Sequence, residues 1–209
     1  ASRMTMANMA IEAGAKCALF TPDEKTAEYC GIELNDFQKS LSGDTDATYI
    51  KTITYRAEDF VPVMACPSQV DKIRDVSDLE GTEIDQVFIG SCTNGRLEDL
   101  KAAAEVLKGK KVAKYVKLIV TPASRKIYRQ AIDMGIMDVL AEAGAIITHP
   151  GCGLCCGRTG GILTDGERVV ATNNRNFLGR MGTSKVEIYL ASPKTAAACA
   201  VAGKIVKPE

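Results

Sequence analysis

The sequence predicts an α/β fold: a three-layer domain with a mostly parallel sheet, preceded by a partial α/β domain. After residue 70, short apolar runs typical of buried strands alternate with amphipathic stretches typical of helices. Strands that alternate with helices usually run parallel to one another. When both faces of such a sheet are covered, its strands are apolar along their whole length. Before residue 70 the pattern is mixed and rich in loops. We therefore expect a partial domain over 1–70 and the sheet domain over 71–209.

Each element of the sheet domain has a local signal. Glycine ends three of the four expected helices, and the last begins with Ser192 as N-cap and Pro193 at its first position. In the first part we expect a helix over 4–15 stopped by Gly14, a strand over 49–55 and an extended linker over 61–70. The expected strands of the sheet domain are 85–90, 116–122, 145–149, 167–173 and 185–191, and its helices are 96–109, 123–135, 137–144 and 192–205.

Composition argues against several classes of protein. The 209 residues carry a formal net charge of zero, so no basic field favours nucleic acid or an anionic membrane. No apolar run approaches the about 20 residues that span a bilayer. Most of the eight cysteines are scattered through an aliphatic chain, which favours reduced thiols in the cytoplasm over disulfides. The chain opens at Ala1 inside a helical pattern, so we expect a fragment or a processed chain.

Four polar or glycine-rich segments each follow an expected strand directly: GSCTNGR, PGCGLCCG, NNRNFLGR and ASP. In open α/β sheets, ligands bind at the carboxyl ends of the strands. We therefore expect side chains of these segments to face one crevice. The candidates are Cys92, Cys152, Cys155, Asn174, Arg175 and Arg180.

The cysteine loops allow four interpretations. Three thiolates from two tight loops can hold an iron–sulfur cluster and leave one iron without a protein ligand, as a Lewis acid. Zinc could bind His149 together with Cys92, Cys152 and Cys155, a closed set of four ligands. A thioredoxin-like pair would need its C-x-x-C at a helix N-terminus, and GLCCGRTGG is too rich in glycine for that. The cysteines could also be buried free thiols.

Three motifs together resemble the aconitase family: GSCTNGR at 90–96, PGCGLCCG at 150–157 and TNNRNFLGRMG at 172–182. MTMANMAIEAGAK at 4–16 and the final SPKTAAACAVAGKI also match, so the resemblance covers most of the chain. Within the family, FIGSCTNGRLEDL and NRNFLGRMG look most like large subunits of the 3-isopropylmalate dehydratase, homoaconitase and dimethylmalate dehydratase branches. The resemblance implies an aconitase-like fold.

The resemblance also implies a cofactor and a reaction. Cys92, Cys152 and Cys155 would be the three ligands of a [4Fe–4S] cluster whose fourth iron binds the carboxylate and hydroxyl of a malate-type hydroxy acid. The hydroxyl would leave, a base on another domain would remove a proton from the adjacent carbon, and water would return in the isomerases. The expected reaction is the isomerisation of 2- and 3-isopropylmalate in leucine biosynthesis, with homoaconitase or 2,3-dimethylmalate dehydratase as alternatives.

Other motif residues take substrate-binding roles by the same resemblance. Asn174, Arg175 and Arg180 match positions around substrate and cluster, and a guanidinium suits a carboxylate because it offers paired hydrogen bonds. Asn8 and Glu12 match the segment that precedes the cluster domain; four residues apart, they would share one helix face. None of the family's catalytic residues is assigned with certainty to this chain. The serine base would lie on a small subunit that carries a swivelling domain, and the chain alone should not turn over substrate.

Three positions depart from the family pattern. Leu154 stands where proline is usual, and Cys156 stands where an aliphatic residue is usual. Cys156 is either a spare thiol beside the cluster or, as we favour, a small buried hydrophobe. His149 stands where asparagine is frequent, and a structural role is favoured for it. Two non-enzymatic alternatives stay open: an RNA-binding module, which the neutral charge disfavours, and a zinc-stabilised binding module.

Overall fold

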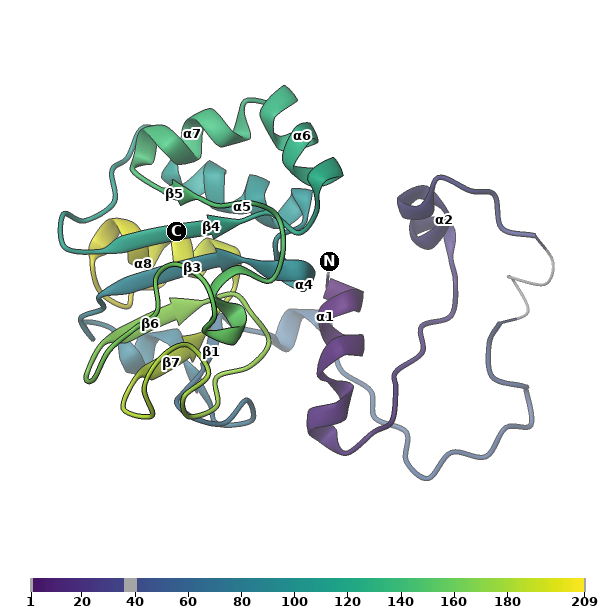
Figure 1. The fold of residues 1–209 in the computed structure, drawn as a ribbon. Coiled ribbons are helices and arrows are strands. Elements are labelled where there is room, and N and C mark those ends of the chain that lie inside the picture. Colours follow the sequence, from purple (N-terminus) through teal and green to yellow (C-terminus); the bar gives the residue numbers. More distant parts are fainter. Residues whose placement is uncertain (1, 36–40, 209) are drawn as a thin grey trace. The chain divides into compact units, whose positions relative to one another are not determined.

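The computed structural model describes residues 2–35 and 41–208 (Figure 1). Contacts divide the chain into two compact units. The first unit combines Ala1–Thr5 with Val61–Glu209, and the second is Met6–Phe60. The division expected at residue 70 remains a prediction.

The first unit contains one seven-stranded sheet in the order β2-β1-β7-β6-β3-β4-β5. The strands β3 to β7 run parallel to one another, and β1 runs antiparallel to both β2 and β7. The predicted mostly parallel α/β sheet is therefore confirmed. Its strands are β1 (Val63–Ala65), β2 (Ile73–Asp75), β3 (Gln86–Gly90), β4 (Lys117–Thr121), β5 (Ile146–Ile147), β6 (Arg168–Ala171) and β7 (Glu187–Leu190).

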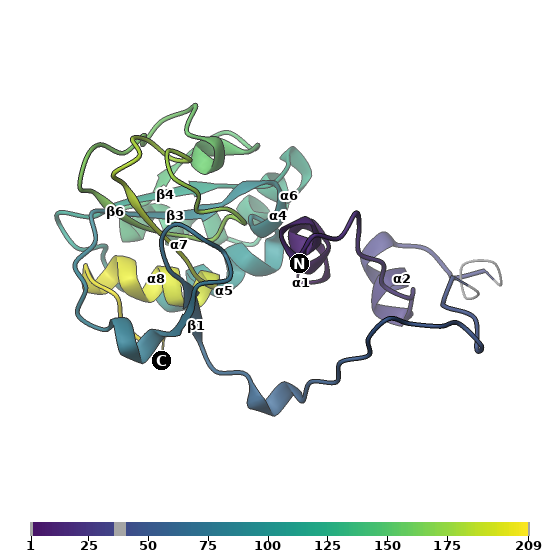
Figure 2. The same cartoon turned by 90° about the horizontal axis from the view of Figure 1, so that it is seen from below.

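The two faces of the sheet bury different cores. Side chains alternate along a strand, so Val87 and Ile89 face one core while Phe88 faces the other. Helices cover the first face, whereas loops and a short 3-10 helix cover the second (Figure 2). The helices of the first face are α5 (Leu97–Leu107), α6 (Arg125–Asp133), α7 (Ile136–Ala143) and α8 (Pro193–Ala202).

Local signals placed these helices, although α5 and α6 end before the glycines that were expected to stop them. The Ser192 side chain accepts a hydrogen bond from Thr195 N at 3.2 Å, and Pro193 stands at the first position of α8, as predicted. Gly144, in the left-handed region, ends α7. The linker expected over 61–70 was partly wrong, since β1 forms within it. Asn176 Nδ2 donates to Cys66 O at 2.7 Å and to Gln69 O at 3.2 Å, long-range contacts that no local pattern could reveal.

The second unit has little regular structure. The helix expected at 4–15 becomes α1 (Ser2–Met9) followed by a 3-10 turn (Ala10–Ala13), and Gly14 ends it in the left-handed region as predicted. The strand expected over 49–55 was wrong, because these described residues alternate in sequence but pair with no neighbouring strand. The unit also contains α2 (Glu24–Cys30) and a 3-10 turn (Ala57–Asp59).

We expect Asp99 to make the stability of the sheet unit depend on pH. Its carboxylate accepts from Arg96 N at 3.0 Å at the start of α5, yet burial raises its pKa from 3.8 to about 6. Because the folded pKa lies above the unfolded one, the stabilising contribution is complete below pH 4 and is lost as pH rises through 6. After allowance for partial exposure, we expect a loss of about 1–2 kcal/mol.

We expect Asp99→Asn, which keeps an oxygen for the Arg96 bond, to flatten this fall and to stabilise the chain at pH 8. Urea unfolding at pH 4.5 and pH 8 measures the effect. Glu105→Gln, on the exposed face of the same helix, is the control. An unchanged pH dependence in Asp99→Asn would refute the assignment.

Candidate metal centre

The first cysteine loop turns sharply out of β3. Gly90 has φ 136°, and Ser91, at φ 82°, starts the short helix α4 (Ser91–Asn94), which presents Cys92 to solvent. A Cβ on Gly90 would overlap the backbone carbonyl of Thr121, the last residue of β4. Only glycine therefore allows the loop to leave the strand so close to its parallel neighbour.

The second cysteine loop contains a 3-10 helix, η4 (Gly153–Cys156), with Cys152 as its N-cap. Leu154, fully buried in the second core, holds this helix against the sheet. A Cβ on Gly153 would overlap Thr121 Oγ1, so this loop packs on the same residue as the first. Thr121 is thus the common support of both cysteine loops. Sequence reasoning missed this role, although Thr121 lies near the end of the expected strand 116–122.

The thiols of the two loops act on one another electrostatically. The pKa of Cys152 is raised, first by the charge of the Cys92 thiolate and then by partial burial, with smaller contributions from Cys155 and Cys156. The favoured assignment of Cys156 as a buried hydrophobe was wrong, because its side chain is exposed. Cys199 differs from all of these, since burial within the helical core raises its pKa to about 11.

Within residues 2–35 and 41–208, no three His, Cys, Asp or Glu side chains converge on one point as the ligands of a single ion do. The zinc site imagined for His149 and the three cysteines requires such convergence. A cluster does not, because its thiolates bind different iron atoms and stand further apart. The donors on the two loops are three thiols, which is the donor chemistry that iron–sulfur clusters use.

The third motif begins where β6 ends and reaches the first cysteine loop through Asn94. Asn94 Nδ2 donates to Asn174 Oδ1 at 2.8 Å and to the carbonyl of Thr172, and its Oδ1 accepts from Thr5 Oγ1 at 2.5 Å. Asn94 and Asn174 are both buried. These bonds fix the chain on either side of the β3–β6 pair. The parallel pairing brings the polar segments to one edge of the sheet, while the shared crevice expected for their side chains stays a prediction.

The two arginines of the motif have different surroundings. Arg175 is half-buried, and its Nη1 donates to Asn174 O at 2.9 Å. Arg180 donates from Nε to Cys155 O at 2.7 Å and from Nη2 to Cys155 Sγ at 3.7 Å. Arg180 therefore contacts a predicted cluster ligand directly, which sequence reasoning did not foresee. Their substrate-binding roles stay predictions.

Asn8 and Glu12 lie in the second unit, where both are exposed. Asn8 belongs to α1, but Glu12 belongs to the tighter 3-10 turn that follows. The spacing of an ideal α-helix therefore does not hold between them. Their part in substrate binding remains a prediction.

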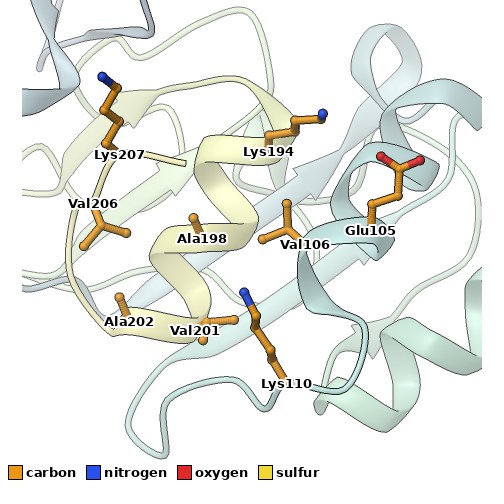
Figure 3. A pocket seen from close by; sticks show the side chains of 9 residues that line it. All are labelled: Glu105, Val106, Lys110, Lys194, Ala198, Val201, Ala202, Val206 and Lys207. Carbon is orange, nitrogen blue, oxygen red and sulfur yellow. The ribbon is translucent and has the colours of Figure 1, made fainter. Parts of the chain in front are cut away.

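A separate hollow lies between α5, α8 and the C-terminal tail, on the helical side of the sheet unit (Figure 3). Three lysines surround a floor of small apolar residues there. None of the predicted site residues lines it. Its lining residues are Glu105, Val106, Lys110, Lys194, Ala198, Val201, Ala202, Val206 and Lys207.

The mostly parallel sheet and its two neighbouring cysteine loops define a thiol-rich α/β domain. The model of the aconitase family (aconitate hydratase) matches residues 1–82 and 72–203. The chain belongs to the aconitase family. Membership implies an iron–sulfur centre in general terms, and the donor set described above is of the right chemistry.

Curated relatives match this chain along its whole length. It is 51% identical over 209 residues to a 3-isopropylmalate dehydratase large subunit of Archaeoglobus fulgidus, covering 99% of this chain and 50% of the relative. It is 52% identical to one of Methanopyrus kandleri, covering 99% and 49%. A probable methanogen homoaconitase large subunit of Methanosarcina mazei is 51% identical, covering 100% and 52%. The chain therefore spans about half the length of these relatives.

Proposed function

We propose that this chain is the cluster-binding part of a hydro-lyase that dehydrates and rehydrates a malate-type hydroxy acid. Cys92, Cys152 and Cys155 would hold a [4Fe–4S] cluster. The observation that carries the proposal is the packing of both cysteine loops on Thr121, which brings Cys92 within electrostatic reach of Cys152 at the carboxyl edge of the sheet. When bound, the cluster supplies an iron that acts as a Lewis acid on the substrate hydroxyl.

The residues of the chain have distinct parts in this scheme. The thiols would hold the cluster, and the buried hydrogen bond between Asn94 and Asn174 ties the first cysteine loop to the segment after β6. Arg175, half-buried next to Asn174, is the candidate for gripping a substrate carboxylate, because its planar fork offers paired donors. Asn8 and Glu12 are proposed to contact substrate from the preceding segment.

We propose 2- and 3-isopropylmalate as the first substrates to test, because most of the relatives named above are 3-isopropylmalate dehydratase large subunits. Homoaconitase chemistry is the alternative, supported by the Methanosarcina mazei relative. We propose a small subunit as partner, because the relatives are called large subunits. Turnover would need that partner and the chain outside these 209 residues, and the reduced thiols would fit the cytoplasm.

The test is anaerobic reconstitution with iron and sulfide, followed by metal and acid-labile sulfide analysis per chain. The parent is expected to take up about four of each, the composition of the proposed cluster. Cys92→Ser, Cys152→Ser and Cys155→Ser should each lose most of this uptake. Cys156→Ser is the matched control, since its thiol lies in the same loop and is exposed, and it should retain the cluster.

Two outcomes would overturn the assignment. Stoichiometric zinc without sulfide would indicate a zinc-stabilised module. Equal loss in Cys156→Ser and Cys155→Ser would mean that the ligand set is wrong.

A further inference from the structure

Arg180 binds Cys155 through two adjacent donors of its guanidinium. Nε donates to the carbonyl oxygen of Cys155 at 2.7 Å, and Nη2 approaches the sulfur of the same residue at 3.7 Å. One of the guanidinium edges that can bind a carboxylate through two parallel hydrogen bonds, the edge formed by Nε and Nη2, therefore faces a cysteine. This geometry differs from the substrate contact expected from the sequence.

The fold holds Arg180 in this place from both sides. Its backbone N donates to Phe177 O at 3.0 Å, and the next residue, Met181, is fully buried in the second core. Gly157, at φ 64°, ends η4 next to the backbone of Arg180, and a Cβ on Gly157 would lie 2.7 Å from Arg180 O. The backbone of Arg180 is thus packed against the cysteine loop, so the side chain has only a short distance to span.

The charge of Arg180 also suits this contact. A guanidinium stays protonated at any working pH, so it is a permanent positive donor beside a sulfur that would be a thiolate in a cluster. Hydrogen bonds to ligand sulfurs stabilise the thiolate and help to set the reduction potential of iron–sulfur centres.

We propose that Arg180 is a positioning residue: it fixes the backbone and sulfur of Cys155 for the cluster and tunes that ligand by an N–H···S hydrogen bond. The inference rests on the cluster proposed above.

The experiment compares Arg180→Gln and Arg180→Lys with Arg158→Gln in the reconstituted chain. Arg158 is the matched control, because it is an exposed arginine that follows the same cysteine loop. The readouts are the rate of iron loss to a chelator and the midpoint potential of the cluster by anaerobic redox titration.

For Arg180→Gln we expect iron loss about 10–100-fold faster, the range found when partners of metal ligands are removed, and a more negative potential. Arg180→Lys keeps the positive charge but loses the paired donors of the guanidinium, so its rate of iron loss and its potential should lie between those of Arg180→Gln and the parent. Arg158→Gln should match the parent. A change in the midpoint potential of the cluster would show that Arg180 tunes Cys155 electronically. A merely structural role would change only the rate at which iron is lost.

Equal potentials and chelation rates in Arg180→Gln and Arg158→Gln would overturn the inference while leaving the cluster in place. A parent chain that takes up no iron and sulfide would instead overturn the proposed function and the inference with it. If Arg180→Gln does not fold, Arg180→Lys decides: a parent-like potential and rate in that variant would overturn the inference.

Discussion

Replacing Gly90 by alanine is expected to lower the free energy of unfolding by about 3–5 kcal/mol, a large part of the total stability of a domain. Two costs add. Gly90 has φ 136°, a conformation that residues with a Cβ rarely adopt, and the new methyl would overlap the carbonyl of Thr121 on the neighbouring strand. Urea unfolding at neutral pH measures the loss.

The same substitution should also disturb the metal centre, because Cys92 lies two residues beyond Gly90. We expect Gly90→Ala to take up less iron and sulfide even at temperatures where it is folded. Gly160→Ala is the control, since a Cβ there meets nothing within 4 Å and its φ lies outside the left-handed region. Parent-like stability in Gly90→Ala would show that β3 and β4 can separate at this point.

Asn176→Ala is expected to cost about 2–4 kcal/mol, through lost hydrogen bonds and the cavity left behind. Asn176 is buried, and its Nδ2 donates to Cys66 O at 2.7 Å and to Gln69 O at 3.2 Å. These bonds tie the segment after β6 to the chain just after β1. Removing the amide leaves the Cys66 carbonyl buried without this donor.

Unfolding by urea, with fluorescence or circular dichroism as the probe, measures this cost. Gln69→Ala is the control, because it removes an exposed side chain and keeps the backbone carbonyl that accepts from Asn176. Similar stability for the two variants would mean that the Asn176 bonds contribute little.

Local chemistry explains which parts of the fold could be predicted. The strands of the sheet domain are buried apolar runs, and the ends of its helices have their own capping residues, such as Ser192. These signals act over a few residues, so sequence alone reveals them. The alternation of apolar residues over 49–55 wrongly predicted a strand. A strand also needs a neighbouring strand to pair with, and a local sequence pattern does not show whether one is present.

The candidate site divides in the same way. The spacing of Cys152 and Cys155, and the strand that precedes each motif, predicted where thiols and arginines would gather. The sequence did not indicate that Thr121 supports both cysteine loops, or that Arg180 turns toward Cys155. Both depend on residues more than 20 positions apart that meet only after the sheet is assembled.

What the sequence by itself determined is the class of the chain: alternating strands and helices, three motifs at the strand ends, and a donor set of thiols. Only the tertiary structure decided the strand order, with β1 antiparallel at the side of β7, and the partners of each polar side chain. The physical reason is the distance along the sequence over which each interaction acts. Capping, periodicity and turn chemistry act between near neighbours, whereas strand order and side-chain contacts are fixed by the packing of the whole sheet unit.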